Sequence, residues 1–197
     1  LTVGVAFNHA AFMGKGKETS TSGAGTTRKV TEEDGAFVDD VASAFVEYAV
    51  TDVVSVGLEY YLSDMTTPTN TNTQRASVEA GAEVTNTVKA TFKDHTTVYL
   101  NIGMPFNTYL KAGYHMVDVA TQENLGTGGK YPDVDTTGYT LGLGYQHTAD
   151  NGMFARIEVS VSEYDDVDAA NTSEADKKVS VSNMYGAAAS LKVGKSF

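Results

Sequence analysis

The sequence predicts an all-β fold, an eight-stranded antiparallel up-and-down transmembrane β-barrel that occupies residues 1–197 as a single domain. Three features predict it. Eight segments alternate apolar and polar residues with the period of two that marks a strand. The connections between these segments alternate between short and long. The face opposite the apolar residues is rich in glycine and charge, which favours a narrow lumen over a water-facing strand surface.

The C-terminal segment, 185–197, shows the alternation well. Every second residue from Tyr185 to Phe197 belongs to a mostly apolar set with an aromatic ring at each end. In another segment, Tyr139 and Tyr145 enclose two leucines in the same way. An apolar strand face with aromatic residues at both ends fits a membrane span between two interfacial girdles.

In chain order, the predicted strands are 1–13, 37–48, 53–62, 86–104, 108–119, 137–147, 153–164 and 185–197. Each is justified by an apolar set of one parity. The eight residues predicted to face lipid near the membrane centre are Val56, Leu58, Leu100, Leu110, Leu141, Leu143, Ile157 and Leu191. In the long segment 86–104, Val88, Ala90 and Phe92 share the parity of Val98, so one uninterrupted outward face is expected.

The connections differ systematically in length. The short ones are 49–52, 105–107 and 148–152, and they carry Asp, Asn, Gly and Pro as turn residues. The long ones are 14–36, 63–85, 120–136 and 165–180, rich in Thr, Ser, Gly, Asn and acidic residues. Strict alternation predicts a barrel with its long loops at one end, outside the cell, and its short turns at the other.

The polar face distinguishes a membrane barrel from a soluble, lipocalin-like barrel. A soluble barrel has its apolar residues inside and its polar residues outside, whereas a membrane barrel has the reverse. Glycines recur on this face, where a narrow lumen needs small residues, and the bulky residues lie on the other. The lumen is therefore expected to hold charged residues, and buried charges must pair. The expected network, with Arg156 as its hub, is Glu47, Glu59, Lys111, Arg156, Glu158 and Lys192, with Lys89 on the same face. Two interpretations stay open: the charges fill the bore and fix the strand register, or they form a gate or ion path.

Composition narrows the function further. A net charge of -11 argues against nucleic-acid binding, which needs a basic surface. No run of 18 apolar residues exists, so no transmembrane helix is expected, and without cysteine there is no thiolate chemistry. The four histidines, which are His9, His95, His115 and His147, lack metal-ligand spacing. No nucleophile or phosphate-loop motif is present. We therefore expect no enzyme, no cofactor and no dedicated metal site.

The chain resembles the small eight-stranded outer-membrane barrels: the OmpA membrane domain, OmpX and the opacity-type surface proteins. The resemblance lies in 44–60, a strand, a tight turn and a second strand, in 109–114, and in the terminal Phe197. It implies that Phe197, with Val193 and Leu191, forms the C-terminal signal read by the barrel-insertion machinery. The chain stops at the eighth strand, so a peptidoglycan tether is not expected, and without Trp its girdles must be built from Tyr and Phe.

These features predict a non-enzymatic barrel in the outer membrane of a Gram-negative bacterium, with its signal peptide already removed. Its expected partners are outer-membrane lipid, the insertion machinery and an extracellular molecule bound by the long loops. The expected role is envelope-structural or surface interaction. A narrow channel for small or apolar solutes is the first alternative, and a soluble ligand-binding barrel is the second.

Overall fold

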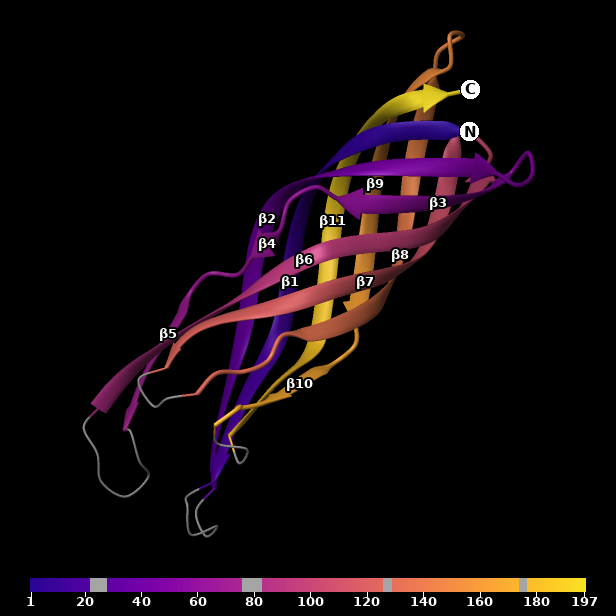
Figure 1. The fold of residues 1–197 in the computed structure, drawn as a ribbon. Coiled ribbons are helices and arrows are strands. Elements are labelled where there is room, and N and C mark those ends of the chain that lie inside the picture. The colour runs from indigo at the N-terminus through magenta and orange to yellow at the C-terminus, as the bar shows by residue number, and fades with distance from the viewer. Residues whose placement is uncertain (22–27, 76–82, 126–128, 174–176) are drawn as a thin grey trace.

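The computed structural model describes residues 1–21, 28–75, 83–125, 129–173 and 177–197. Its strands are β1 (Thr2–Thr21), β2 (Arg28–Ala49), β3 (Val54–Tyr61), β4 (Met65–Thr66), β5 (Asn70–Arg75), β6 (Glu83–Met104), β7 (Thr108–Leu125), β8 (Val134–Thr148), β9 (Met153–Tyr164), β10 (Val167–Ala170) and β11 (Lys178–Ser196). Eight of them form an antiparallel ring in the order β1–β2–β3–β6–β7–β8–β9–β11, and β11 pairs with β1 to close it (Figure 1). The predicted all-β, up-and-down barrel is confirmed. Among the described residues, no helix is long and apolar enough to cross a membrane.

The register of the ring fixes the tilt of its strands. A path that starts at Val3 and passes from each residue to its cross-strand partner goes once around the ring. It returns to β1 at Met13, ten residues further along the strand. The intermediate partners are Val46, Leu58, Val98, Tyr114, Tyr139, Glu163 and Tyr185. A shift of ten residues around eight strands corresponds to a tilt of roughly 40° and a backbone radius of roughly 8 Å. Such a cylinder has room for side chains and little else, so its interior must be packed.

The outside of the ring is apolar. All eight residues predicted to face lipid are exposed, from Val56 at 37% to Ile157 at 61%. Exposed tyrosines stand near both ends of this band, with Tyr139 and Tyr145 enclosing Leu141 and Leu143 on β8. Leucine and isoleucine exposed all round a closed ring would be unfavourable in water, so this surface is built to face hydrocarbon. The orientation inferred from parity is therefore confirmed.

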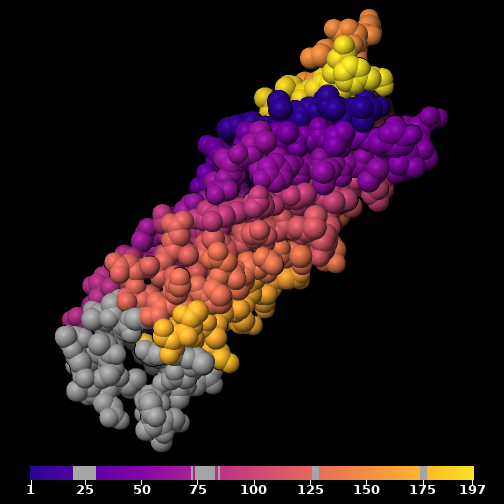
Figure 2. All heavy atoms as spheres, viewed as in Figure 1, coloured from indigo at the N-terminus to yellow at the C-terminus, as the bar shows by residue number. Residues whose placement is uncertain are grey.

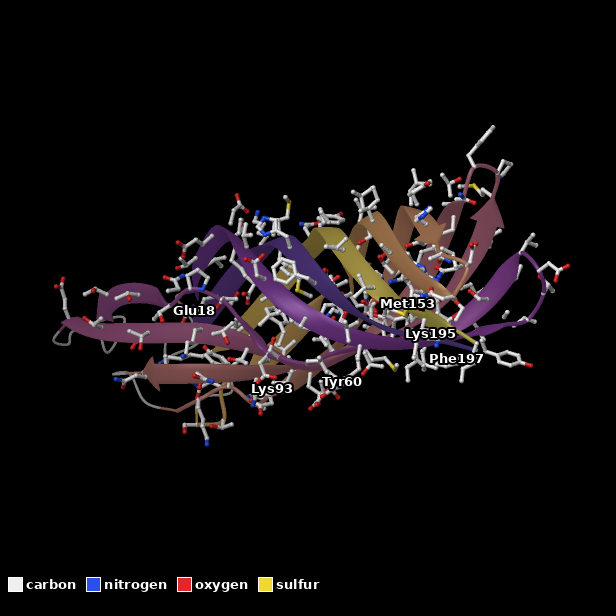
Figure 3. All side chains as sticks on the ribbon, turned by 90° about the horizontal axis from the view of Figure 1, so that it is seen from above. Glu18, Tyr60, Lys93, Met153, Lys195 and Phe197 are labelled. Carbon is white, nitrogen blue, oxygen red and sulfur yellow. The ribbon has the colours of Figure 1, made fainter. Side chains whose placement is uncertain are left out.

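The two ends of the barrel differ. The N- and C-terminal residues lie together at one end of an elongated body (Figure 2). Met153, Lys195 and Phe197 lie at this end, and Glu18 lies toward the other (Figure 3). Because Met153 follows a short turn, this is also the end of the short connections.

The predicted loops 14–36, 63–85, 120–136 and 165–180 are too long. β1 and β2 continue as a paired hairpin to Thr21 and Arg28, and β6 and β7 pair as far as Asn86 and Leu125. These extensions lack an apolar face, so alternation of apolar and polar residues does not predict them. Threonine-rich segments still pair well as strands, because β-branched side chains suit the pleated backbone.

One expected face is wrong. β6 has a bulge between Lys93 and Thr96, where Asp94 adopts a left-handed φ of 49°. The extra residue reverses the parity of the strand. Phe92 lies opposite Val119, on the inner side of the ring, and Lys89 lies opposite Gln122 on the outer side. Val88 and Ala90, like Phe92, therefore do not face lipid, and Lys89 is not a lumen residue.

Candidate functional site

The six charged residues expected in the lumen all lie inside the ring, none more than 7% exposed. They come from five strands: Glu47 on β2, Glu59 on β3, Lys111 on β7, Arg156 and Glu158 on β9, and Lys192 on β11. Three cations meet three carboxylates, so the formal charge of the set is zero. The net charge of -11 therefore comes from residues outside this set.

Four of these residues form a closed ring of ion pairs, which we call the ion quartet: Lys111, Lys192, Glu59 and Glu158. Lys111 Nζ lies 2.8 Å from Glu59 Oε2 and 3.3 Å from Glu158 Oε1. Lys192 Nζ lies 3.1 Å from each of the same two oxygens. The second oxygen of Glu59 accepts a hydrogen bond of 2.6 Å from Ser43. Each cation thus contacts both anions, which offsets the desolvation of four buried charges.

Arg156 belongs to a separate pair next to the short turns. Its guanidinium binds Glu47 through two nitrogens, at 2.5 and 2.7 Å. Tyr99 and Asn101 donate to Glu47 Oε1 at 2.9 and 2.8 Å. The guanidinium also lies 4.7 Å from the centre of the Phe154 ring, in a cation–π contact. The expectation that Arg156 would be the hub of the network is wrong for the described residues, because the two lysines bridge the other carboxylates.

Two lumen glycines make room for tyrosine rings on the neighbouring strand. Gly57 is the cross-strand partner of Tyr99, and Gly144 is that of Tyr109. A Cβ at either glycine would stand 2.3 Å from the ring of its tyrosine. Each ring therefore lies over its glycine, and the Tyr109 hydroxyl reaches Glu158 at 2.7 Å. This explains why glycine recurs on the lumen face of the sequence.

Further from the short turns, the lumen holds a pair of histidines that the sequence pattern does not predict. His95 Nε2 and His115 Nδ1 lie 3.0 Å apart. Around this pair, the Thr97 hydroxyl lies 2.7 Å from His115 Nδ1, and the Ser162 hydroxyl lies 3.1 Å from His115 Nε2. The ring of Tyr61 stacks on that of His95, with 4.1 Å between the ring centroids. Both histidines share the parity of the buried lumen residues on their strands, but parity alone does not show that the two side chains meet. Among the described residues, no group of three or more His, Cys, Asp or Glu is arranged to hold a metal.

A small cavity separates the ion quartet from the histidine pair. Its volume is about 20 Å³, room for about one water molecule. Its polar walls include Asn8, Thr140, Ser160, Ser162 and Ser190. Beyond the histidines, the rings of Phe12, Phe37 and Phe92 stack with centroid distances of 5.1 to 6.5 Å. The bore is thus filled by successive layers, charged near the short turns and aromatic toward the long hairpins.

The proposed insertion signal lies on the outer face of the last strand. Leu191, Val193 and Phe197 are all exposed, Phe197 at 78%. The backbone N–H of Phe197 donates to the carbonyl of Leu1 at 2.9 Å, which extends the closure of the ring to the last residue. Recognition of these residues by insertion machinery stays a prediction.

No protein-family model matches the chain. No curated protein sequence matches it either. Its fold is similar to that of the outer membrane protease OmpT from Escherichia coli, with a TM-score of 0.51 at 9% identity, covering 100% of this chain and 97% of that one. It is similarly close to the outer membrane protein OprG from Pseudomonas aeruginosa, with a TM-score of 0.51 at 13% identity, covering 96% and 95%. The chain therefore has the fold of outer-membrane β-barrels, a likeness of fold and not of sequence.

Proposed function

We propose that the protein is a non-enzymatic barrel of a Gram-negative outer membrane, with an envelope-structural or surface-interaction role carried by its long hairpins. One observation carries the proposal. The bore is packed with a neutral, fully paired ion network, while β1, β2, β6 and β7 extend well beyond the apolar band. A filled bore leaves the projecting end as the surface on which a partner can bind. Binding residues concentrate on such segments when a rigid scaffold holds them.

A channel for small or apolar solutes is the second candidate, supported by the polar cavity beside the ion quartet. The quartet and the Phe12–Phe37–Phe92 stack both stand in the path of a hydrated ion. We therefore expect the wild-type protein to give no large, stable current in a planar bilayer. Brief, rare openings are compatible with exchange of ion-pair partners. A sustained, weakly selective conductance would contradict the filled bore and favour the channel.

Surface exposure of the long hairpins can be tested because the chain has no cysteine. A single Thr172→Cys variant places a thiol at the long-hairpin end, and Asp52→Cys places one in a short turn. On intact cells, a membrane-impermeant maleimide should label the thiol at position 172 and label the thiol at position 52 only after the outer membrane is permeabilised. Labelling with the opposite preference would show that the proposed topology is inverted.

A further inference from the structure

The hydrogen-bonded ring is continuous through the apolar band but splits beyond it. β3 ends at Tyr61, and the chain then follows β6 rather than β2, since β4 and β5 both pair with β6. Beyond the last bond to this part of the chain, β2 runs for 14 more residues, from Val41 to Arg28, and pairs with β1 on one side only. Figure 1 shows the result as two diverging arms, with β5, β6 and β7 in one and β1 and β2 in the other. We call the interval between β2 and β4–β5 the seam.

The backbone groups that face the seam can be identified. The last bond between β2 and the chain after β3 runs from Leu62 N–H to Ala42 C=O, at 2.8 Å. In an antiparallel strand, the N–H and C=O of one residue point to the same side, and successive residues alternate. The register of β2 with β1 is unbroken, so even-numbered residues face the seam and odd-numbered ones bind β1. Among the described residues, the seam-facing backbone groups of Glu32, Asp34, Ala36 and Val38 have no hydrogen-bond partner, whereas the Asp40 N–H is bound by the Asp39 carboxylate at 2.9 Å.

Elsewhere the gaps between the projecting strands are bridged by hydrogen bonds. Thr121 N–H donates to Asp133, and Thr172 N–H donates to the carbonyl of Lys130 at 2.8 Å. Across the seam, the described residues offer one such contact, a side-chain bond of 2.8 Å from Asn70 to Glu33. Within the part of the chain that the structure describes, the β2 edge is therefore a long strand edge with unpaired backbone groups, the kind of edge that accepts an added strand.

The charges on this edge restrict what can be added. β2 carries five acidic residues over 32–40. Glu32 is neutralised by Lys15 and Lys17, at 2.8 and 3.3 Å, and the hydrogen bond from Lys15 lowers the pKa of the Glu32 carboxyl. Asp34 has no ion pair of its own among the described residues. A second copy of this edge would bring a second set of five acidic residues close to the first, and this like charge disfavours self-association, whereas a basic strand would be attracted.

We propose that the seam edge of β2, residues 32–38, binds an extended, basic segment of another protein as an additional antiparallel strand. This inference rests on the proposed surface role and specifies its partner. The backbone supplies affinity through the free groups of the even-numbered residues. Their side chains point outward, so selectivity comes from a partner with cations opposite Asp34 and Asp40 and apolar residues opposite Ala36 and Val38. Of the two acids, Asp40 already contacts His9 Nδ1 at 2.6 Å, so Asp34 is the main site of charge recognition.

The first test is amide exchange in the free protein. In β2, the odd-numbered amides from Glu33 to Phe37 should be protected by β1, and those of Asp34, Ala36 and Val38 should exchange quickly. Protection of both sets in the free protein would mean that the chain itself covers the edge. That result would overturn the inference, while the labelling of Thr172→Cys would still decide the surface role.

The second test uses a nine-residue peptide that matches 32–40 in antiparallel register, with Lys opposite Asp34 and Asp40, Val opposite Ala36 and Val38, and Thr elsewhere. Binding to the protein in lipid nanodiscs should protect the three even-numbered amides. Ala36→Pro removes one seam-facing N–H and leaves the β1 ladder intact, since edge positions tolerate proline. It should weaken binding by about tenfold or more, whereas Ala36→Thr, which keeps the N–H, should not.

A further variant, Asp34→Asn, should weaken binding and reduce its salt dependence. A peptide with Glu in place of Lys should bind far more weakly than the basic one. Equal affinity of Ala36→Pro and Ala36→Thr would show that the peptide adheres by charge alone and would overturn strand addition. Failure of the basic peptide to protect any even-numbered amide would do the same.

Discussion

Replacement of Glu59 by Gln is expected to lower the free energy of unfolding by about 3–5 kcal/mol, the usual cost of removing one partner from a buried ion pair. Glu59 Oε2 lies 2.8 Å from Lys111 Nζ and 3.1 Å from Lys192 Nζ. Without it, Glu158 alone must compensate two buried ammonium groups. Glutamine keeps the shape of the side chain and the hydrogen bond from Ser43, so the loss of stability measures the effect of removing the charge. Because the chain has no Trp, urea-dependent folding into vesicles should be followed by far-UV circular dichroism.

The matched control restores neutrality. Glu59→Gln combined with Lys192→Met leaves one lysine facing one glutamate, and methionine fills much of the lysine volume. We expect this double variant to be more stable than Glu59→Gln alone, so the two substitutions should show a strong favourable coupling in a double-mutant cycle. A single-variant loss well under 1 kcal/mol, or additive losses, would contradict a tightly balanced quartet.

The barrel could be predicted from the sequence because one property, the period of two, fixes both the strand and the side it presents. On β8, Leu141 and Leu143 alternate with Gly142 and Gly144, and both assignments follow without any knowledge of partners. The same property concealed the bulge in β6. Phe92 and Val98 are six residues apart and share parity, so the segment looked continuous although it reverses at Asp94. A single aspartate with a left-handed backbone adds one residue to the strand, and the residues on either side of it still alternate, so the pattern does not reveal the bulge.

The charged residues could be assigned to the lumen, but their partners could not be assigned. The alternation along each strand predicts that Glu47 and Arg156 point inward. The alternation does not predict which charges pair. In the closed ring, with its shift of ten residues, Arg156 pairs with Glu47, and the two lysines pair with Glu59 and Glu158. Pairing across a barrel depends on shear, which is a property of the closed ring. The projecting hairpins were missed for a related reason, since their pairing rests on backbone bonds rather than on a buried apolar face.

The orientation of the barrel in a membrane predicts a second large effect. Replacement of Leu141 by Arg should destabilise the folded protein in bilayers by about 2–4 kcal/mol, the cost of placing Arg near the midplane on the lipid face of a barrel. Leu141 is 60% exposed and lies between Tyr139 and Tyr145 on the outer face of β8. An arginine there makes no clash inside the ring, so the destabilisation reports the surrounding hydrocarbon.

Val30→Arg provides the matched control, because both substitutions replace an exposed apolar strand residue by arginine and only the surroundings of the two sites differ. Val30 is also an exposed apolar residue on a strand, 44% exposed, but it lies near the far end of the β1–β2 hairpin, opposite Thr19. In water, both substitutions would change stability by roughly 0.5 kcal/mol or less, as surface substitutions usually do. In bilayers, only Leu141→Arg should be costly. The comparison in urea-dependent refolding into vesicles therefore isolates the lipid contribution, and equal small effects at both sites would argue that the apolar band does not face lipid.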